Sequence, residues 1–341
     1  MSQRGISTVV DATLALLLIS ASILVVATSL AADQPGMDLE ASDHVSETVS
    51  ISTANVSYSL RPVVDDIDDV DFEDDAYSNS VFQRQRYGSV ADLVASSTML
   101  NVTIEGRQLT REGEIYADAV EGSLMEALTG LGYDAYVTGR WQPYDGASIA
   151  ATGTYGSPPP GDADVQLATL RVPSGVQPVS EDVEDAYEDG YGTGRSDQKY
   201  ERAAGVLAET IVERYLPAGE TQVALEGQWF RRDLAVYRYL RIESILAETE
   251  ADSDWGDEYY HFDPATDENV LGRSGANATK ANAYLARGTD GLGPSAAGEA
   301  DGLRGVIEDD LKETISHEEM KSFDESSSIE EIVITVRVWR A

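Results

Sequence analysis

Histidines, cysteines and clustered carboxylates carry much of the chemistry that proteins perform, and this 341-residue chain uses them sparingly. It has no cysteine, which excludes disulfides, thiolate metal sites and thiol nucleophiles. Its three histidines, His44, His261 and His317, lie far apart in sequence and form no HExxH motif. No serine stands in a GxSxG context. The sequence therefore shows no recognised motif for nucleophilic or metal-assisted catalysis.

Two acidic segments are the remaining candidates for a cation or an acid–base pair. Residues 65–75 (DDIDDVDFEDD) lack the glycine and the spaced glutamate of an EF-hand, which favours a solvated loop. Residues 257–263 (DEYYHFD) crowd acids, a histidine and aromatics together, but one such cluster is expected by chance among 61 acidic residues. Carboxylate pairs that hydrolyse glycosides leave no spacing signature, so a hydrolase stays open as an alternative. We expect no enzyme, no metal site and no cofactor.

The charge balance is the most unusual feature of the composition. Aspartate and glutamate number 61 against 24 lysines and arginines, which gives a net charge of −37, and only four of the basic residues are lysines. Such self-repulsion is tolerable where salt screens it, since the Debye length falls to roughly 3 Å at molar salt. Acidic excess with scarce lysine resembles the proteins of halophilic archaea. The same charge argues against a nucleic-acid partner, whose phosphates it would repel.

The segment from Ala12 to Ala32 contains no charged residue. At about 1.5 Å per residue, a helix of this length spans roughly 30 Å, which matches the hydrocarbon core of a bilayer. A plain transmembrane anchor fits this length, and the flanking Arg4 favours a cytoplasmic N-terminus with the body outside. A secretory signal peptide has a shorter apolar core, although residues 29–31 (SLA) could serve as its cleavage site.

The residues before this segment support a third interpretation. Arg4-Gly5-Ile6-Ser7-Thr8, directly before the apolar run, resembles the class III signal peptide of archaeal type IV pilins and archaellins. The resemblance implies that a prepilin peptidase cleaves after Gly5, so that Ile6 becomes the new terminus. It also implies that Asp11 pairs with a neighbouring subunit's terminal amine while the apolar helices pack together. Asp11 could instead reach the cytoplasmic headgroups.

The apolar run ends differently from that of bacterial-type pilins, whose helix continues into the head. Here Pro35 and Gly36 interrupt a continuing helix, because proline lacks the N–H donor and clashes with the preceding turn. The part of the chain after the anchor is also larger than a major archaeal pilin needs. We therefore expect a minor or pilin-like subunit rather than the main filament protein.

The body after the anchor shows both strand and helix patterns, which predicts an α+β fold. Alternating apolar residues predict strands, and apolar residues at helical spacing predict helices. We expect strands near residues 54–60, 100–104, 133–141, 165–172 and 332–339. We expect helices near residues 89–99, 114–131, 199–216, 220–248, 280–285 and 303–320. These strands should form a mostly antiparallel sheet covered by helices, with the apolar final strand paired inside the sheet.

Breaks in these patterns suggest four divisions of the chain. Residues 1–34 would form the signal or transmembrane helix, and 35–175 the first part of the α+β head. Residues 176–198, which are acidic and rich in glycine, predict a linker or loop. Residues 199–341 would be a helical part with the C-terminal strand, packed on the same head. The glycines at 190–194 do not follow a strand and lack the dinucleotide-binding spacing.

Three N-x-S/T sequons are the candidate modification sites. They occur at Asn55, Asn101 and Asn277, among only six asparagines, and favour exposure to an extracytoplasmic glycosylation machinery.

The densest basic cluster falls in the helix expected at residues 220–248. Arg231, Arg238 and Arg241 share about one quadrant of that helix and could dock on an acidic neighbour such as another copy's loop. The alternative is pairing with nearby acids of the same segment, namely Glu226, Asp233, Glu243 and Glu248.

The sequence thus predicts a single-pass cell-membrane protein with an extracellular head, resembling a minor pilin-like subunit that works by assembly. Its expected partners are membrane lipid, a prepilin-type peptidase, and other pilin-like subunits or copies of itself, with which it could form a surface filament. Two alternatives remain: an anchored surface protein that binds a ligand without polymerising, and, with less support, an anchored hydrolase.

Overall fold

The computed structural model describes residues 39–65, 79–128, 132–191, 198–227, 230–246, 271, 275–288 and 302–340. The expected anchor, with Arg4, Gly5, Ile6 and Asp11, lies outside these residues, as do most of the acidic segment 65–75 and all of 257–263. Within the described residues, no helix has the length and apolarity that crossing a bilayer requires.

Six antiparallel strands form the main sheet, in the order β4-β3-β6-β5-β8-β7. Their bounds are β3 Val102–Ile104, β4 Arg107–Gln108, β5 Asp134–Trp141, β6 Ile149–Gly156, β7 Gln166–Pro173 and β8 Glu331–Trp339. The predicted α+β class with an antiparallel sheet is confirmed. The C-terminal strand β8 lies between β5 and β7, as its apolar alternation predicts.

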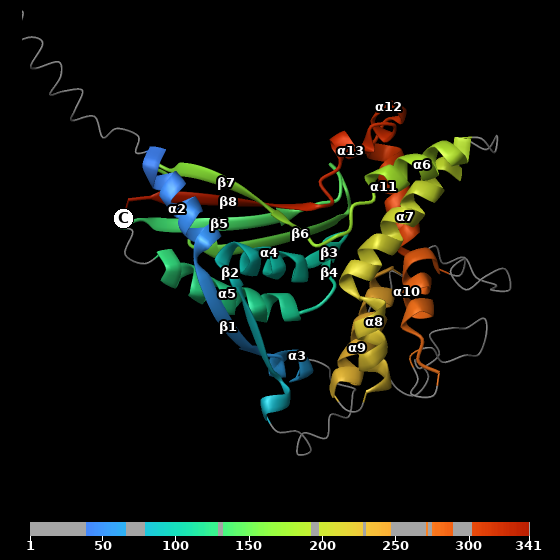
Figure 1. The fold of residues 1–341 in the computed structure, drawn as a ribbon, viewed down its shortest axis with the longest axis horizontal. Coiled ribbons are helices and arrows are strands. Elements are labelled where there is room, and N and C mark those ends of the chain that lie inside the picture. Colours follow the sequence, from blue (N-terminus) through green and yellow to red (C-terminus); the bar gives the residue numbers. More distant parts are fainter. Residues whose placement is uncertain are drawn as a thin grey trace, which may run out of the picture.

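Helices cover one face of this sheet, which holds much of the core (Figure 1). They are α2 (Leu39–Ile51), α4 (Val90–Leu100) and α5 (Glu112–Leu128). Val137, Ile334 and Val336 point into this layer and are fully or almost fully buried. The other face carries polar residues, with Thr154, Thr138, Thr335 and Thr169 aligned across four neighbouring strands. We call the sheet with these three helices and the hairpin described next the sheet lobe.

A separate two-stranded hairpin extends from this layer. It pairs β1 (Thr53–Ser59) with β2 (Gln83–Ser89), with the short helices α3 (Arg61–Asp65) and η2 (Asn79–Val81) between them in sequence. Tyr58 of β1 packs on Tyr116 of α5, with ring centroids 4.9 Å apart. The hairpin therefore covers α5 and places the side chains of β2 beside the helices at the end of the sheet.

The remaining helices stand together at one end of the sheet and form what we call the helical lobe (Figure 1). They are α6 (Ser180–Tyr191), α7 (Gln198–Tyr215), α8 (Ala218–Glu226), α9 (Phe230–Leu246), α10 (Ala278–Arg287) and α11 (Gly302–Thr314). Helix α7 is central and contacts α6, α10 and α11. Two short helices, α12 (His317–Met320) and α13 (Phe323–Ser326), lead the chain back to β8.

The structure differs from the predicted elements at several places. Residues 180–191, expected in a linker, form α6, whose Val183 and Tyr187 are buried. The segment 220–248 contains two helices, with Gly227 following α8 in an extended conformation. Helix α2 was not predicted, because few of its residues are both apolar and buried.

Strands β2 and β6 were also missed, and β6 shows why. Its Gly153 breaks the apolar alternation, yet a side chain there would collide with the Tyr155 hydroxyl and approach Thr98 of α4 closely. Close packing of the helix on the sheet thus requires a residue that weakens the strand pattern.

Candidate functional site

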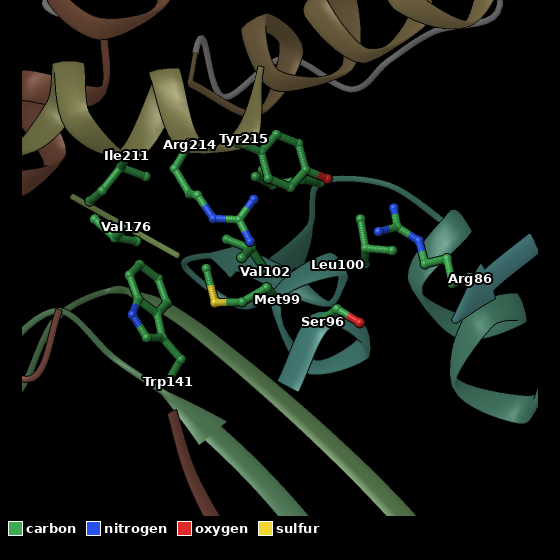
Figure 2. A pocket seen from close by; sticks show the side chains of 11 residues that line it. Arg86, Ser96, Met99, Leu100, Val102, Trp141, Val176, Ile211, Arg214 and Tyr215 are labelled. Carbon is green, nitrogen blue, oxygen red and sulfur yellow. The ribbon is translucent and has the colours of Figure 1, made fainter. Parts of the chain in front are cut away.

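A small cavity of about 80 Å³ lies where the sheet lobe meets the helical lobe (Figure 2). Its walls come from β2, α4, β3, β5 and α7, together with the loop after β7. Most of its lining is apolar: Met99, Leu100, Val102, Leu109, Val176 and Ile211. The polar part of the lining consists of Arg86, Arg214, Ser96, Tyr215 and the indole of Trp141. We call this space the seam cavity.

Arg214, in the last turn of α7, is held in place by the loop that follows β7. Its Nε–H donates to the Ser174 carbonyl oxygen at 3.1 Å. Gly175 has a φ of +75°, and a Cβ there would lie 2.9 Å from the Arg214 Nε. The guanidinium therefore lies directly against the backbone at a position where only glycine fits without displacement. Burial, and then the like charge of Arg86, lower the pKa of Arg214, which places the two arginines in the same electrostatic environment.

Arg86 reaches the cavity from β2 on the other side. Its guanidinium lies over the ring of Tyr116, 5.4 Å from the centroid. Burial by itself lowers the pKa of Arg86, but a hydrogen bond with Tyr58 and the negative charge nearby hold that pKa above its ordinary value. Figure 2 shows the Arg86 guanidinium turned toward Leu100 and that of Arg214 extending from α7 toward Val102.

The neutral polar groups of the cavity wall already have hydrogen-bond partners. The Trp141 Nε1–H donates to the Ile329 carbonyl at 2.8 Å. The Ser96 hydroxyl donates to the Leu93 carbonyl at 3.0 Å and lies 3.0 Å from the Tyr116 hydroxyl. The Tyr215 hydroxyl donates to Thr110 Oγ1 at 3.4 Å, and burial raises the pKa of Tyr215 to about 12. The neutral groups are thus engaged with the protein itself.

The two arginines of the cavity differ from these neutral groups. Within the described part of the chain, neither Arg86 nor Arg214 forms an ion pair with a carboxylate. A guanidinium carries five N–H donors, and one bond from Arg214 to a carbonyl leaves most of its donors available. The site therefore offers positive charge and hydrogen-bond donors next to an apolar wall.

A buried ion pair lies beside the cavity and joins the two lobes. Glu112, the first residue of α5, is 4% exposed and pairs with Arg238 of α9. Its carboxylate also accepts a hydrogen bond from the Tyr58 hydroxyl at 3.3 Å. Burial lowers the pKa of Arg84 on β2, while the negative charge of Glu112 opposes that shift. Glu112 therefore neutralises a region that several arginines share.

This pair also gives a partner for the middle residue of the predicted arginine stripe. Arg238 pairs with an acid 126 positions away in the same chain and, within the described residues, with none of Glu226, Asp233 and Glu243; Glu248 lies outside those residues. Arg231 is exposed and Arg241 is half-buried. Neither of these two forms an ion pair within the described residues.

The three sequons lie in different surroundings. Asn55 is exposed on β1. The side chain of Asn101 is engaged on both sides, since its amide nitrogen donates to the Ser97 carbonyl and its oxygen accepts from Gln108. The Asn277 oxygen caps α10 by accepting from the Lys280 N–H at 2.9 Å. In the folded head, Asn55 is the most accessible of the three for modification.

Two of the histidines lie within the described residues, and neither lines the cavity. His44 is on α2, and His317 Nδ1 lies 2.7 Å from the Tyr187 hydroxyl. No group of three or more histidine, aspartate or glutamate side chains suited to a metal ion occurs among the described residues. The described lining of the cavity therefore consists mainly of apolar side chains with two arginines, a serine and two aromatic residues, and the buried carboxylate of Glu112 lies beside it.

The comparison with known protein families matches nearly the whole chain. A single family model covers residues 10–339, which include the whole uncharged segment 12–32, both lobes and β8. The chain belongs to the family of unknown function DUF7284. No curated protein and no solved structure matches it. Because the match begins before the head, the family pattern joins the apolar segment and the head in one unit.

The sequence interpretation missed Arg86, Arg214, Gly175 and Glu112. Arg86 and Arg214 lie 128 positions apart, so spacing gives no indication that they share a cavity. One local signal was available, because Ser174-Gly175 directly follows the strand ending at Pro173 and marks a tight turn. The partner of that turn, Arg214, is fixed only by the packing of α7.

Proposed function

We propose that this protein is a membrane-anchored, extracytoplasmic component that resembles a minor pilin-like subunit of an archaeal type IV pilus system. The observation that carries the proposal is Arg4-Gly5 directly before Ile6 and the uncharged run from Ala12 to Ala32. The family match extends into this run, which supports treating it as part of the functional protein. Such a segment is long enough to span the bilayer core.

The beginning of the head supports a fixed attachment. Only residues 33–38 separate the uncharged run from α2. Helix α2 is part of the core, because Val45 and Val49 are almost fully buried and the helix contacts β7, β8, α4 and α5. A short connection to a packed helix would hold the head close to the membrane surface, as a subunit that assembles laterally requires.

The proposed mechanism is assembly after processing. A prepilin-type peptidase cleaves between Gly5 and Ile6 on the cytoplasmic side. Asp11 then neutralises the new amine of a neighbouring subunit, which relieves the cost of placing a carboxylate in lipid. The apolar helices pack side by side with other pilin-like subunits or with copies of this chain.

Mass spectrometry of the protein from its native membrane tests this mechanism. We expect a mature terminus at Ile6 for the natural sequence and an unprocessed chain for Gly5→Val. Asp11→Asn should still be processed but should be recovered less often in cross-linked multimers. A terminus at Met1 or Ser2 in the natural protein would contradict the assembly mechanism.

A second candidate function is an anchored surface protein that binds a ligand without polymerising. The seam cavity favours it, because two arginines without carboxylate partners face an apolar wall there. A terminus at Met1 or Ser2, together with a monomer after cross-linking, would support this function over assembly. The hydrolase alternative requires convergent acids in a pocket; no carboxylate lines the seam cavity among the described residues, whereas two surface hollows are lined by Asp189 and Glu201 and by Glu209 and Glu213.

A further inference from the structure

We infer that the seam cavity is a binding site for a small organic carboxylate with a short apolar stem. The carboxylate would lie between Arg86 and Arg214, and the stem would contact the apolar wall formed by residues such as Met99, Val102 and Ile211. The inference rests on the ligand-binding form of the proposed function. It does not depend on peptidase processing, because all the residues involved belong to the head.

Two arginines from different lobes line the same cavity. Arg86, exposed on β2, and Arg214, half-buried at the end of α7, both line it and have no carboxylate partner among the described residues. Two guanidiniums at one cavity repel each other, and burial adds to the cost of the charge on Arg214. A carboxylate bound between them would offset that repulsion.

Hydrogen bonding selects an anion with acceptor oxygens. The neutral polar groups of the wall are engaged with protein partners, so the guanidiniums provide the donors that remain. Arginine presents its N–H groups in a fork that matches the two oxygens of a carboxylate. Gly175 and Ser174 hold Arg214 in position, which means that little side-chain freedom is lost when the ligand binds.

The size and polarity of the cavity limit the rest of the ligand. A volume of about 80 Å³ accommodates roughly five to eight water-sized groups, at about 10–15 Å³ each. The lining beyond the arginines is largely aliphatic, with the indole of Trp141 on one side. Such a wall favours a stem of a few carbons over a second charged group. Butyrate has a suitable size and chemistry to serve as a probe.

The test measures binding of butyrate to the full chain in detergent micelles at molar salt, by calorimetry and by the thermal unfolding midpoint. We expect saturable binding of one butyrate per chain and a rise in the midpoint, since a ligand bound across both lobes stabilises the folded state. Acetate, which lacks the stem, and 1-butanol, which lacks the charge, should each bind at least tenfold more weakly. Replacing chloride with nitrate or sulfate at the same ionic strength measures how strongly inorganic anions compete with butyrate.

Variants then identify the residues that bind the probe. Arg214→Gln and Arg86→Gln should each weaken butyrate binding at least tenfold, whereas Arg140→Gln should leave it unchanged. Arg140 is an exposed arginine on β5 that bonds Gln142, so its replacement removes one charge away from the cavity. Arg214→Lys keeps the charge but loses the fork, and it should also weaken binding. Gly175→Ala displaces the guanidinium without changing any charge and should act in the same direction.

Three results would overturn the inference. The first is no saturable butyrate binding by the folded natural protein. The second is equal binding of butyrate and 1-butanol, which would indicate an apolar cavity alone. The third is unchanged affinity in folded Arg214→Lys and Gly175→Ala, which would place the ligand elsewhere. A chain that binds butyrate but keeps Met1 would retain this inference while contradicting assembly, so the two failures are distinguishable.

Discussion

Two arginine environments lie side by side where the lobes meet, and they differ in how positive charge is balanced. Arg238 crosses from α9 to Glu112 on α5, and the carboxylate also receives the Tyr58 hydroxyl. Arg214 and Arg86 face a cavity, and within the described residues neither is paired with a carboxylate. The first arrangement is complete within the chain and holds the lobes together. The second arrangement leaves guanidinium N–H donors available to a ligand, which is typical of a binding site.

The buried pair also shows how an arginine stabilises a carboxylate inside this acidic chain. Surface ion pairs contribute little stability, whereas removing one partner of a buried pair leaves an uncompensated charge. Glu112 is 4% exposed, so its carboxylate depends on Arg238 for stabilisation. Helix α9 carries another carboxyl, the half-buried Glu243, which interacts with Tyr284 and forms no ion pair among the described residues. Substitutions of these carboxyl groups and of their partners therefore test how the chain balances its buried charges.

The largest effect is expected from Glu112→Gln. The change leaves the Arg238 guanidinium without its counter-charge and should lower the free energy of unfolding by about 3 kcal/mol. This is the lower end of the range for a buried pair, because the Arg238 side chain is 28% exposed. Denaturant unfolding in molar salt measures it. Glu313→Gln, at an exposed position of α11, is the control and should change stability by less than about 0.5 kcal/mol. Equal effects of the two substitutions would show that the pair is not stabilising.

The next effect is a pH dependence that Glu243 contributes. Burial raises its pKa from 4.5 to about 7, against a smaller opposing effect of its hydrogen bond with Tyr284. Below the unfolded-state pKa the carboxyl is protonated in both states and does not change the free energy of unfolding. In the window between the unfolded-state and the folded-state pKa, the unfolded chain ionises first, so stability falls as the pH rises until it exceeds the folded-state pKa.

Glu243→Gln removes this titration and isolates it from the other acids. The variant should match the natural protein near the lower end of the window and exceed its stability by about 2 kcal/mol above the upper end. Thermal unfolding as a function of pH provides the measurement. A constant difference between the two proteins at all pH values would show that Glu243 ionises normally in the folded state.

A smaller effect is expected from Tyr58→Phe. The substitution keeps the aromatic packing on Tyr116 but removes the hydroxyl that donates to Glu112. Stability should fall by about 1 kcal/mol, the usual net value of one hydrogen bond, or somewhat more because the acceptor is charged. Tyr87→Phe on β2, where the side chain is 75% exposed, is the matched control and should have no measurable effect. The same loss at both positions would exclude a special role for the Tyr58 hydroxyl.

The smallest effect is expected at Arg231, although it belongs to the same predicted stripe as Arg238. Arg231→Ala should change the free energy of unfolding by less than about 0.5 kcal/mol, because the residue is exposed. Arg238→Ala should destabilise the protein about as much as Glu112→Gln does. Comparable losses at the two arginines would mean that helix position, and not the partner Glu112, determines their contribution.

Local patterns predicted much of the secondary structure. Alternating apolar residues located β1, β5, β7 and β8, and helical spacing located α4, α5 and α7. The prediction failed where tertiary contacts override local preference. Gly153 lies within β6 because α4 packs closely above it, and the acidic residues 180–191 form α6 because Val183 and Tyr187 pack into the helical lobe.

The sequence by itself determined the charge, the absence of thiol chemistry and a 21-residue uncharged segment of membrane-spanning length. These properties follow from composition and from neighbouring residues, so no fold is needed to derive them. Only the tertiary structure decided which arginines are paired and which face the cavity. Glu112 and Arg238 are 126 positions apart, and Arg86 and Arg214 are 128 apart, so their proximity depends on the packing of α7 and α9 against the sheet lobe.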